Sequence, residues 1–173
     1  MTTSRQAFSD TPTVVAGLDP GLANLGLGVV RSQGRDTVYV GSQLVRTSSR
    51  KDQSARLRYL FEQVDGFFAE HRPDALAIEG QFFHQRGDIS FKVGQAFGVC
   101  LLAASQRDIP VFEYGPMEVK QTLVGTGKAS KAQVGYMVRA LLNMTKQPPS
   151  NHVADALALA LTHLSYQTLR AKL

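Results

Sequence analysis

Apolar residues along the chain form two kinds of pattern, short continuous runs and longer stretches with helical spacing. The short runs are bounded by polar or turn-forming residues and predict strands at residues 13–18, 25–30, 37–40, 75–79 and 109–114. The helically spaced stretches predict helices at residues 52–69, 90–106, 117–123, 131–142 and 151 to about 169. Strands therefore dominate the first part of the chain and helices the last.

The order of these elements predicts an α/β fold. The first three strands follow one another through short polar connections and are expected to pair antiparallel. A strand, a helix and a further strand favour a parallel pair with a right-handed crossover. We therefore expect a five-stranded mixed sheet, three antiparallel strands then two parallel ones, flanked by helices. With 173 residues the chain has room for one such domain, residues 13–169, between a flexible N-terminal extension (1–12) and a C-terminal tail (170–173).

Charge and cysteine content narrow the classes of partner and compartment. Lys and Arg outnumber Asp and Glu by 19 to 14, and the isoelectric point near 9.6 indicates a polyanionic partner. Cys100 is the single cysteine and lies in an apolar run, which excludes an internal disulfide, suits a reducing compartment and predicts a packing role. No segment resembles a signal peptide or a membrane span, so we expect a cytoplasmic protein without a membrane partner.

Two acidic residues stand at the carboxyl ends of predicted strands. Asp19 opens an Asp-Pro-Gly turn after the first strand, and Glu79 follows the apolar run of the fourth. If these strands are neighbours, the two carboxylates converge where open α/β sheets build their sites. Taken alone, Asp19 also fits simple turn chemistry, and Glu79 a structural ion pair. A buried carboxylate that lacked a metal or cation would be costly, which favours a functional role for Glu79.

His152 and Asp155 stand three residues apart at the start of the last predicted helix and share one face of it. The alternative is that Asp155 only complements the helix dipole, with Ser150 or Asn151 as the cap. Three acids and a histidine at the ends of elements would suit a hard cation such as Mg²⁺, which takes oxygen ligands and keeps waters for substrate phosphates.

Six segments resemble the successive signature segments of the RuvC family, in family order and spread over residues 13–164. They are GLDPG (17–21), AIE (77–79), GQAFGV (94–99), VFEY (111–114), VKQTLVG (119–125) and ADALA (154–158). The resemblance implies a ribonuclease H-like fold and a homodimeric, metal-dependent Holliday junction resolvase acting in DNA recombination and repair. It further implies paired symmetric nicks that leave 5′-phosphate ends, and a branch-migration helicase as a partner.

The resemblance matches the family's four catalytic side chains to Asp19, Glu79, His152 and Asp155. Two Mg²⁺ ions per subunit are then expected, with Asp19 bridging them and Glu79 and Asp155 on separate ions. Many members carry Asp where this chain has His152, and an imidazole suits Mn²⁺ better than Mg²⁺. His152 is therefore either a ligand or a proton-transfer group.

DNA-binding candidates lie in two loops. Lys120, Lys128 and Lys131 surround residues 125–127 and would meet phosphates without reading sequence. The resemblance supports Lys120 and Lys131 most directly, while Lys128 fits a solvated surface equally well.

The second loop, residues 81–86, carries Phe82, Phe83 and Arg86 shortly after Glu79. Phe82 matches a family aromatic that stacks on a base near the crossover. Phe83 is expected to stack as well or to seal the core.

Other functions remain as alternatives. A ribonuclease H-like nuclease for RNA–DNA hybrids would use the same acids, but the aromatic loop and the apolar helix with Gly94 and Gly98, a plausible dimer face, favour a two-fold branched substrate. An actin-like ATPase would need a duplicated second domain, and a junction-binding module would have lost cleavage through His152. Residues 26–31 and 125–128 fall short of nucleotide-binding motifs, and no cysteine–histidine cluster suggests structural zinc. We expect neither cofactor.

Overall fold

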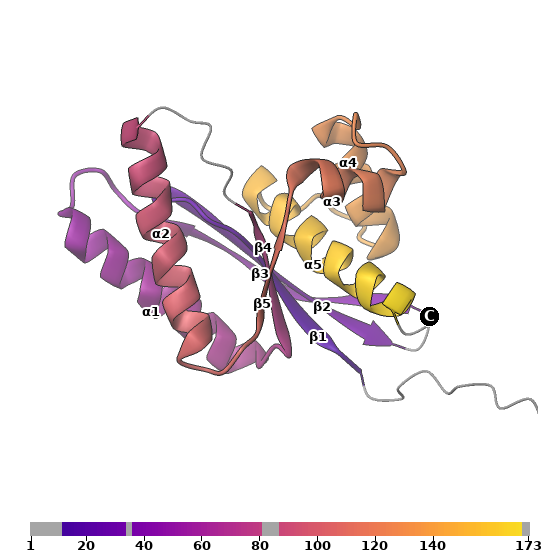
Figure 1. The fold of residues 1–173 in the computed structure, drawn as a ribbon, viewed down its shortest axis with the longest axis horizontal. Coiled ribbons are helices and arrows are strands. Elements are labelled where there is room, and N and C mark those ends of the chain that lie inside the picture. The colour runs from indigo at the N-terminus through magenta and orange to yellow at the C-terminus, as the bar shows by residue number, and fades with distance from the viewer. Residues whose placement is uncertain (1–11, 34–35, 81–86, 171–173) are drawn as a thin grey trace, which may run out of the picture.

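The structure is a computed structural model that describes residues 12–33, 36–80 and 87–170. It contains a five-stranded sheet in the order β3-β2-β1-β4-β5 (Figure 1). The strands are β1 (Val14–Asp19), β2 (Asn24–Gln33), β3 (Asp36–Arg46), β4 (Ala75–Glu79) and β5 (Val111–Tyr114). Most of the predicted N-terminal extension and of the C-terminal tail lies outside the described residues.

The strand directions confirm the predicted mixed sheet. β1 pairs antiparallel with β2, and β2 antiparallel with β3, whereas β4 runs parallel to both β1 and β5. One boundary was wrong, because β3 continues to Arg46 and not to residue 40. Polar residues such as Ser42 and Gln43 ended the predicted strand, but β3 is an edge strand and most of its side chains are only partly covered.

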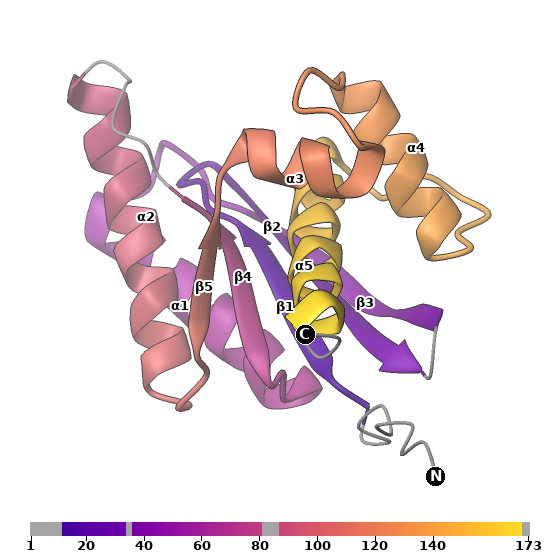
Figure 2. The ribbon, with the colours of Figure 1, turned by 45° about the vertical axis from the view of Figure 1, so that its right-hand side comes forward.

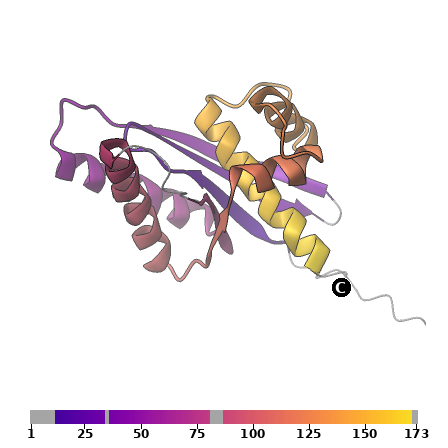
Figure 3. The same ribbon diagram turned by 45° about the horizontal axis from the view of Figure 1, so that its top comes forward.

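Helices cover both faces of the sheet. α1 (Gln53–His71) and α2 (Gly87–Ser105) pack on one face, and α5 (Asn151–Arg170) crosses the other (Figures 1 and 2). α3 (Pro116–Val124) and α4 (Lys131–Leu141) lie beside α5 and share its apolar cluster (Figure 3). Cys100 is fully buried in the α1–α2 cluster, which confirms the packing role, and burial raises the pKa of its thiol to about 12.

Two glycines in the sheet let α5 approach it closely. A Cβ on Gly17 of β1 would lie 1.7 Å from the carbonyl oxygen of Ala156, and one on Gly28 of β2 would lie 2.6 Å from the Leu157 side chain. Glycine at these positions therefore allows the backbone of α5 to lie directly on β1 and β2. Among the described helices, none combines the length and the apolar character that crossing a membrane requires.

Candidate active site

The ends of β1 and β4 place Asp19 and Glu79 side by side. These parallel neighbours are in register through Leu18 and Ile78, so the next residue of each strand lies at the same edge of the sheet. Each carboxylate follows a run of buried residues, which brings it partly into the protein. The predicted convergence of the two acids is confirmed.

The first turn of α5 packs against β2, the strand beside β1, and so reaches this pair of acids. A Cβ on Gly26 of β2 would lie 2.1 Å from the carbonyl oxygen of His152, so only glycine allows this approach. Gly26 is the register partner of Asp19, and the helix therefore begins directly over the edge of the sheet where Asp19 and Glu79 lie. The result is a hydrogen bond of 2.7 Å between His152 Nδ1 and Asp19 Oδ2.

Asp155 stands in the second turn of α5, and a residue outside the helix caps it. Ser150 has that role, since its hydroxyl accepts a hydrogen bond from the backbone N–H of Val153 at 3.1 Å. The carboxylate of Asp155 instead lies 3.2 Å from the ammonium of Lys131, the first residue of α4. Ser150 as the cap agrees with the helix-dipole alternative, but Asp155 lies beyond the first turn of α5, where the dipole acts most strongly, and its contact with Lys131 favours the site interpretation.

The start of α4 is itself fixed by a capping box. Ser130 Oγ accepts a hydrogen bond from the Gln133 backbone N–H at 3.2 Å, and Gln133 Oε1 accepts one from the Ser130 backbone N–H at 2.8 Å. Lys131 follows directly, so these bonds determine where its long side chain begins. The capping box thus fixes the start of α4, from which the Lys131 side chain reaches Asp155.

The carboxylates repel one another in a partly buried position. Burial is the main cause that raises the pKa of Asp19, and the hydrogen bond from His152 partly opposes it. The pKa of Glu79 is raised first by burial and then by the charges of Asp19 and Asp155. The pKa of Lys131 is raised chiefly by Asp155. The site therefore carries excess negative charge that a further cation would relieve.

These side chains line one open cavity of about 390 Å³. Its acidic and imidazole groups come from the sheet edge and α5, and its cations from α3 and α4. The lining residues are Asp19, Glu79, Pro116, Val119, Lys120, Lys131, Val134, Asn151, His152, Asp155, Ala158 and Leu159.

The donor set fits a divalent metal cation, because carboxylate oxygens are the ligands that hard cations prefer. Within the described residues, no three His, Cys, Asp or Glu side chains are yet arranged to hold one ion. In this arrangement the His152 ring is bonded to Asp19, and Asp155 is paired with Lys131.

Two of the predicted DNA-binding lysines lie at the cavity, and one lies away from it. Lys120 and Lys131 line the cavity, whereas Lys128 is exposed and is not among its lining residues, so a role for Lys128 stays a prediction. Phe82, Phe83 and Arg86 lie outside the described residues.

Two neighbouring residues were missed from the sequence. Asn151 lines the cavity, although its only signal was as an alternative cap. Gln121 holds the loop beside Lys120: its Nε2 donates to the Gly125 carbonyl at 2.9 Å, and its Oε1 accepts from the Gly127 backbone N–H at 3.1 Å. Gln121 lies in the RuvC-like segment 119–125, but that resemblance did not indicate that its side chain holds the loop.

A five-stranded mixed sheet with acids at the ends of its two adjoining parallel strands defines the chain as a ribonuclease H-like protein with a carboxylate site. Residues 15–163 match the family model described as crossover junction endodeoxyribonuclease RuvC. A protein of that name from Thermus thermophilus is 42% identical over 156 residues, which cover 88% of this chain and 94% of the relative. The chain belongs to the RuvC family.

Solved structures agree with this assignment. A structure of T. thermophilus RuvC in complex with Holliday junction substrate superposes with a TM-score of 0.87 at 41% identity, covering 92% of this chain and 97% of the other. The yeast mitochondrial Holliday junction resolvase Ydc2 has a TM-score of 0.65 at 13% identity, covering 91% of this chain and 80% of the other, and supports the fold alone. The predicted fold and family are both confirmed.

Proposed function

We propose that this protein is a metal-dependent endonuclease that resolves Holliday junctions by paired, symmetric nicks. The observation that carries the proposal is the convergence of Asp19, Glu79, His152 and Asp155 in one open cavity that also contains Lys120 and Lys131. Family membership supports the branched DNA substrate, and it also implies a branch-migration helicase as a partner.

The four side chains would share the work of holding two cations. Asp19 stands between Glu79 and His152 and is the candidate bridging ligand, with Glu79 and Asp155 on separate ions. When bound, the ions would supply an activated water and stabilise the leaving oxygen of the phosphodiester. Mg²⁺ is the expected ion, and the imidazole of His152 favours activity with Mn²⁺ as well.

His152 is suited to orient Asp19 or to move a proton. Its Nδ1 bonds Asp19, which fixes the ring beside the bridging carboxylate. Lys120 and Lys131 would bind the phosphates that flank the cut, because their ammonium groups are the cations that line the cavity. Phe82 and Phe83 would stack on bases near the crossover, a role proposed from the sequence.

The test is cleavage of a synthetic four-way DNA junction with Mg²⁺ and then Mn²⁺, by the wild type and by Asp19→Asn. A linear duplex and an RNA–DNA hybrid serve as controls. Paired symmetric nicks that the substitution abolishes would support the proposal. Tight binding without cleavage in either metal would make the protein a binding module, and cutting of the hybrid alone would make it a ribonuclease.

The exposed face of α2 supports a homodimer. Phe91 and Leu102 are 68% and 51% exposed, and Gly98 lies between them on the same helix. Among the described residues, and apart from the adjoining backbone of α2, no heavy atom lies within 4 Å of where a Cβ on Gly94 or Gly98 would stand, so these glycines pack against no other element there. An apolar face of this kind is suited to close packing against a second copy.

Gly98→Glu tests the dimer, because the new side chain has open space in the monomer but would bury a charge between two subunits. We expect monomers by sedimentation and little paired cleavage. Gly135→Glu on α4, where a Cβ also meets open space, is the matched control and should stay dimeric. A fully active, dimeric Gly98→Glu protein would remove α2 from the interface.

A further inference from the structure

The connection between β3 and α1 carries a second group of cations at the catalytic end of the sheet. Arg46 ends β3, Arg50 and Lys51 follow, and all three side chains are exposed. None of them forms an ion pair with any residue in the part of the chain that the structure describes. The residues between them are Thr47, Ser48 and Ser49, so the first acid reached is Asp52 at the start of α1. We call residues 46–51 the basic loop.

The basic loop is fixed to the turn that follows Asp19. The Thr47 backbone N–H donates to the Ala23 carbonyl at 3.0 Å, and the Thr47 hydroxyl donates to the Leu22 carbonyl. Arg56, only 8% exposed, donates from Nε to Thr47 Oγ1 at 2.9 Å and from Nη2 to the Leu22 carbonyl at 3.4 Å. The catalytic turn and the basic loop are therefore held together by a buried guanidinium.

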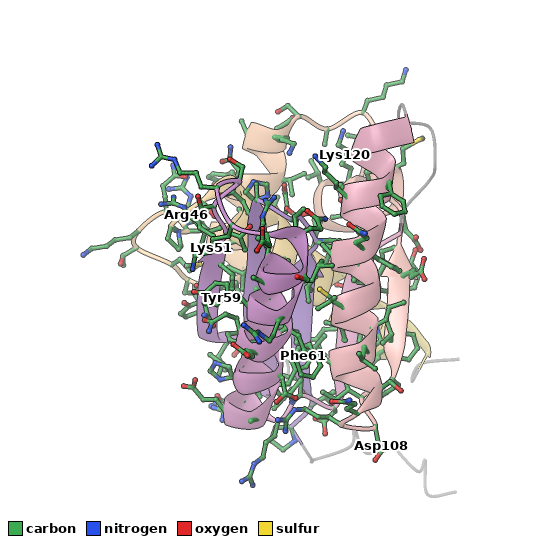
Figure 4. All side chains as sticks on the ribbon, turned by 90° about the vertical axis from the view of Figure 1, so that its left-hand side faces the viewer. Arg46, Lys51, Tyr59, Phe61, Asp108 and Lys120 are labelled. Carbon is green, nitrogen blue, oxygen red and sulfur yellow. The ribbon has the colours of Figure 1, made fainter. Side chains whose placement is uncertain are left out.

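The basic loop and Lys120 lie on opposite flanks of the carboxylates. β3 is one edge of the sheet, whereas Lys120 follows β5 at the other edge. Figure 4 shows Arg46, Lys51 and Lys120 toward one end of the molecule and Asp108 at the other. Two strand spacings separate β1 from β3, about 10 Å, which corresponds to about three base pairs of duplex at about 3.4 Å each.

We propose that Arg46, Arg50 and Lys51 bind the phosphate backbone of a junction arm, about three base pairs from the cut and on the side away from Lys120. Exposed cations and hydroxyls with no aromatic residue among them are suited to phosphates and not to bases. The loop would hold the arm while the cavity lysines hold the scissile strand. This inference rests on the proposed function, since it assumes a junction substrate.

The test measures junction binding across a range of salt concentrations in a parent protein carrying Asp19→Asn, which is expected to bind without cutting. Arg50→Gln/Lys51→Gln is compared with Arg31→Gln/Arg72→Gln. The control removes the same charge from exposed arginines at the opposite end of the sheet, since Arg31 pairs with Val14 at the start of β1 and Arg72 precedes β4.

We expect the loop variant to lower the slope of log affinity against log salt by about 1.8 for two lost phosphate contacts, and to bind roughly tenfold more weakly per contact near 0.1 M salt. The control should keep the parent slope. Equal slopes in the two double variants, in a parent that binds junctions, would overturn this inference alone. A parent that fails to bind junctions would overturn the proposed function, and this inference with it.

Discussion

Replacing Gly26 with alanine tests whether the contact between β2 and α5 sets the geometry of the site. The new Cβ would lie 2.1 Å from the His152 carbonyl oxygen, whereas real Cβ contacts shorter than 3.0 Å essentially never occur. The neighbouring atoms are backbone, so the start of α5 must move away by about 1 Å. That shift would carry His152 away from Asp19, to which it is bonded at 2.7 Å.

A misplacement of about 1 Å at a catalytic centre costs on the order of 100-fold in rate. The overlap should also destabilise the protein by about 1–3 kcal/mol, which lowers the melting temperature by several degrees in a chain of this size. Junction cleavage is therefore measured well below the melting temperature of the variant, together with junction affinity. We expect kcat to fall while affinity is largely kept, because the lysines on α3 and α4 are not displaced.

Gly66→Ala is the matched control, because a Cβ there meets nothing within 4 Å on the exposed side of α1. Alanine in a helix should be neutral or stabilise the fold by up to about 1 kcal/mol, with full activity. If Gly26→Ala cleaves and melts like the wild type, the close approach of α5 to β2 does not position the site.

Three further perturbations follow from the charges of the structure. Asp19→Asn should raise the melting temperature of the metal-free protein by a few degrees, since burial raises the pKa of this carboxyl and its charge is unfavourable; a lower melting temperature would contradict this. The Arg107 hydrogen bond lowers the pKa of Asp65, so the pair stabilises the fold above the ordinary pKa of Asp and loses that effect as pH falls through the lowered value. Arg107→Ala should then slightly lower the free energy of unfolding measured in urea at pH 7. The loss should shrink below about pH 4, whereas a loss independent of pH would argue for packing. Lys131→Met removes the cation that is paired with Asp155, so it should bind Mn²⁺, without DNA, about fivefold more tightly than the wild type, as measured by electron paramagnetic resonance. Lys120→Met is the comparison and should gain less. Equal gains in the two variants would show that direct pairing with a carboxylate is unimportant.

The sheet and the paired acids could be predicted because they depend on local pattern and chain order. Apolar runs gave the strands, the helix between the third and fourth strands indicated a parallel pair, and the strand ends located Asp19 and Glu79. The end of β3 could not be predicted, since its edge position, and not its composition, determines that polar residues continue the strand.

The contacts within the site could not be predicted, because they depend on how α5 packs on the sheet. Gly26 and Gly28 were considered only as part of an incomplete nucleotide-binding motif, yet their missing side chains make room for α5. The bonds of His152 with Asp19 and of Lys131 with Asp155 join residues far apart in the chain, and each follows from that packing. The sequence therefore indicated which residues belong to the site, but not which side chains contact one another there.

The position of α5 along the chain has a consequence for protein synthesis. A growing chain makes β1 and β4 long before it makes His152 and Asp155, and chains fold from their N-terminal part while synthesis continues at about 5–20 residues per second. Until α5 emerges from the ribosome, two of the four site residues are missing and the sheet face that α5 covers is open to solvent. The four site residues therefore come together only after all five strands and the first four helices have been synthesised.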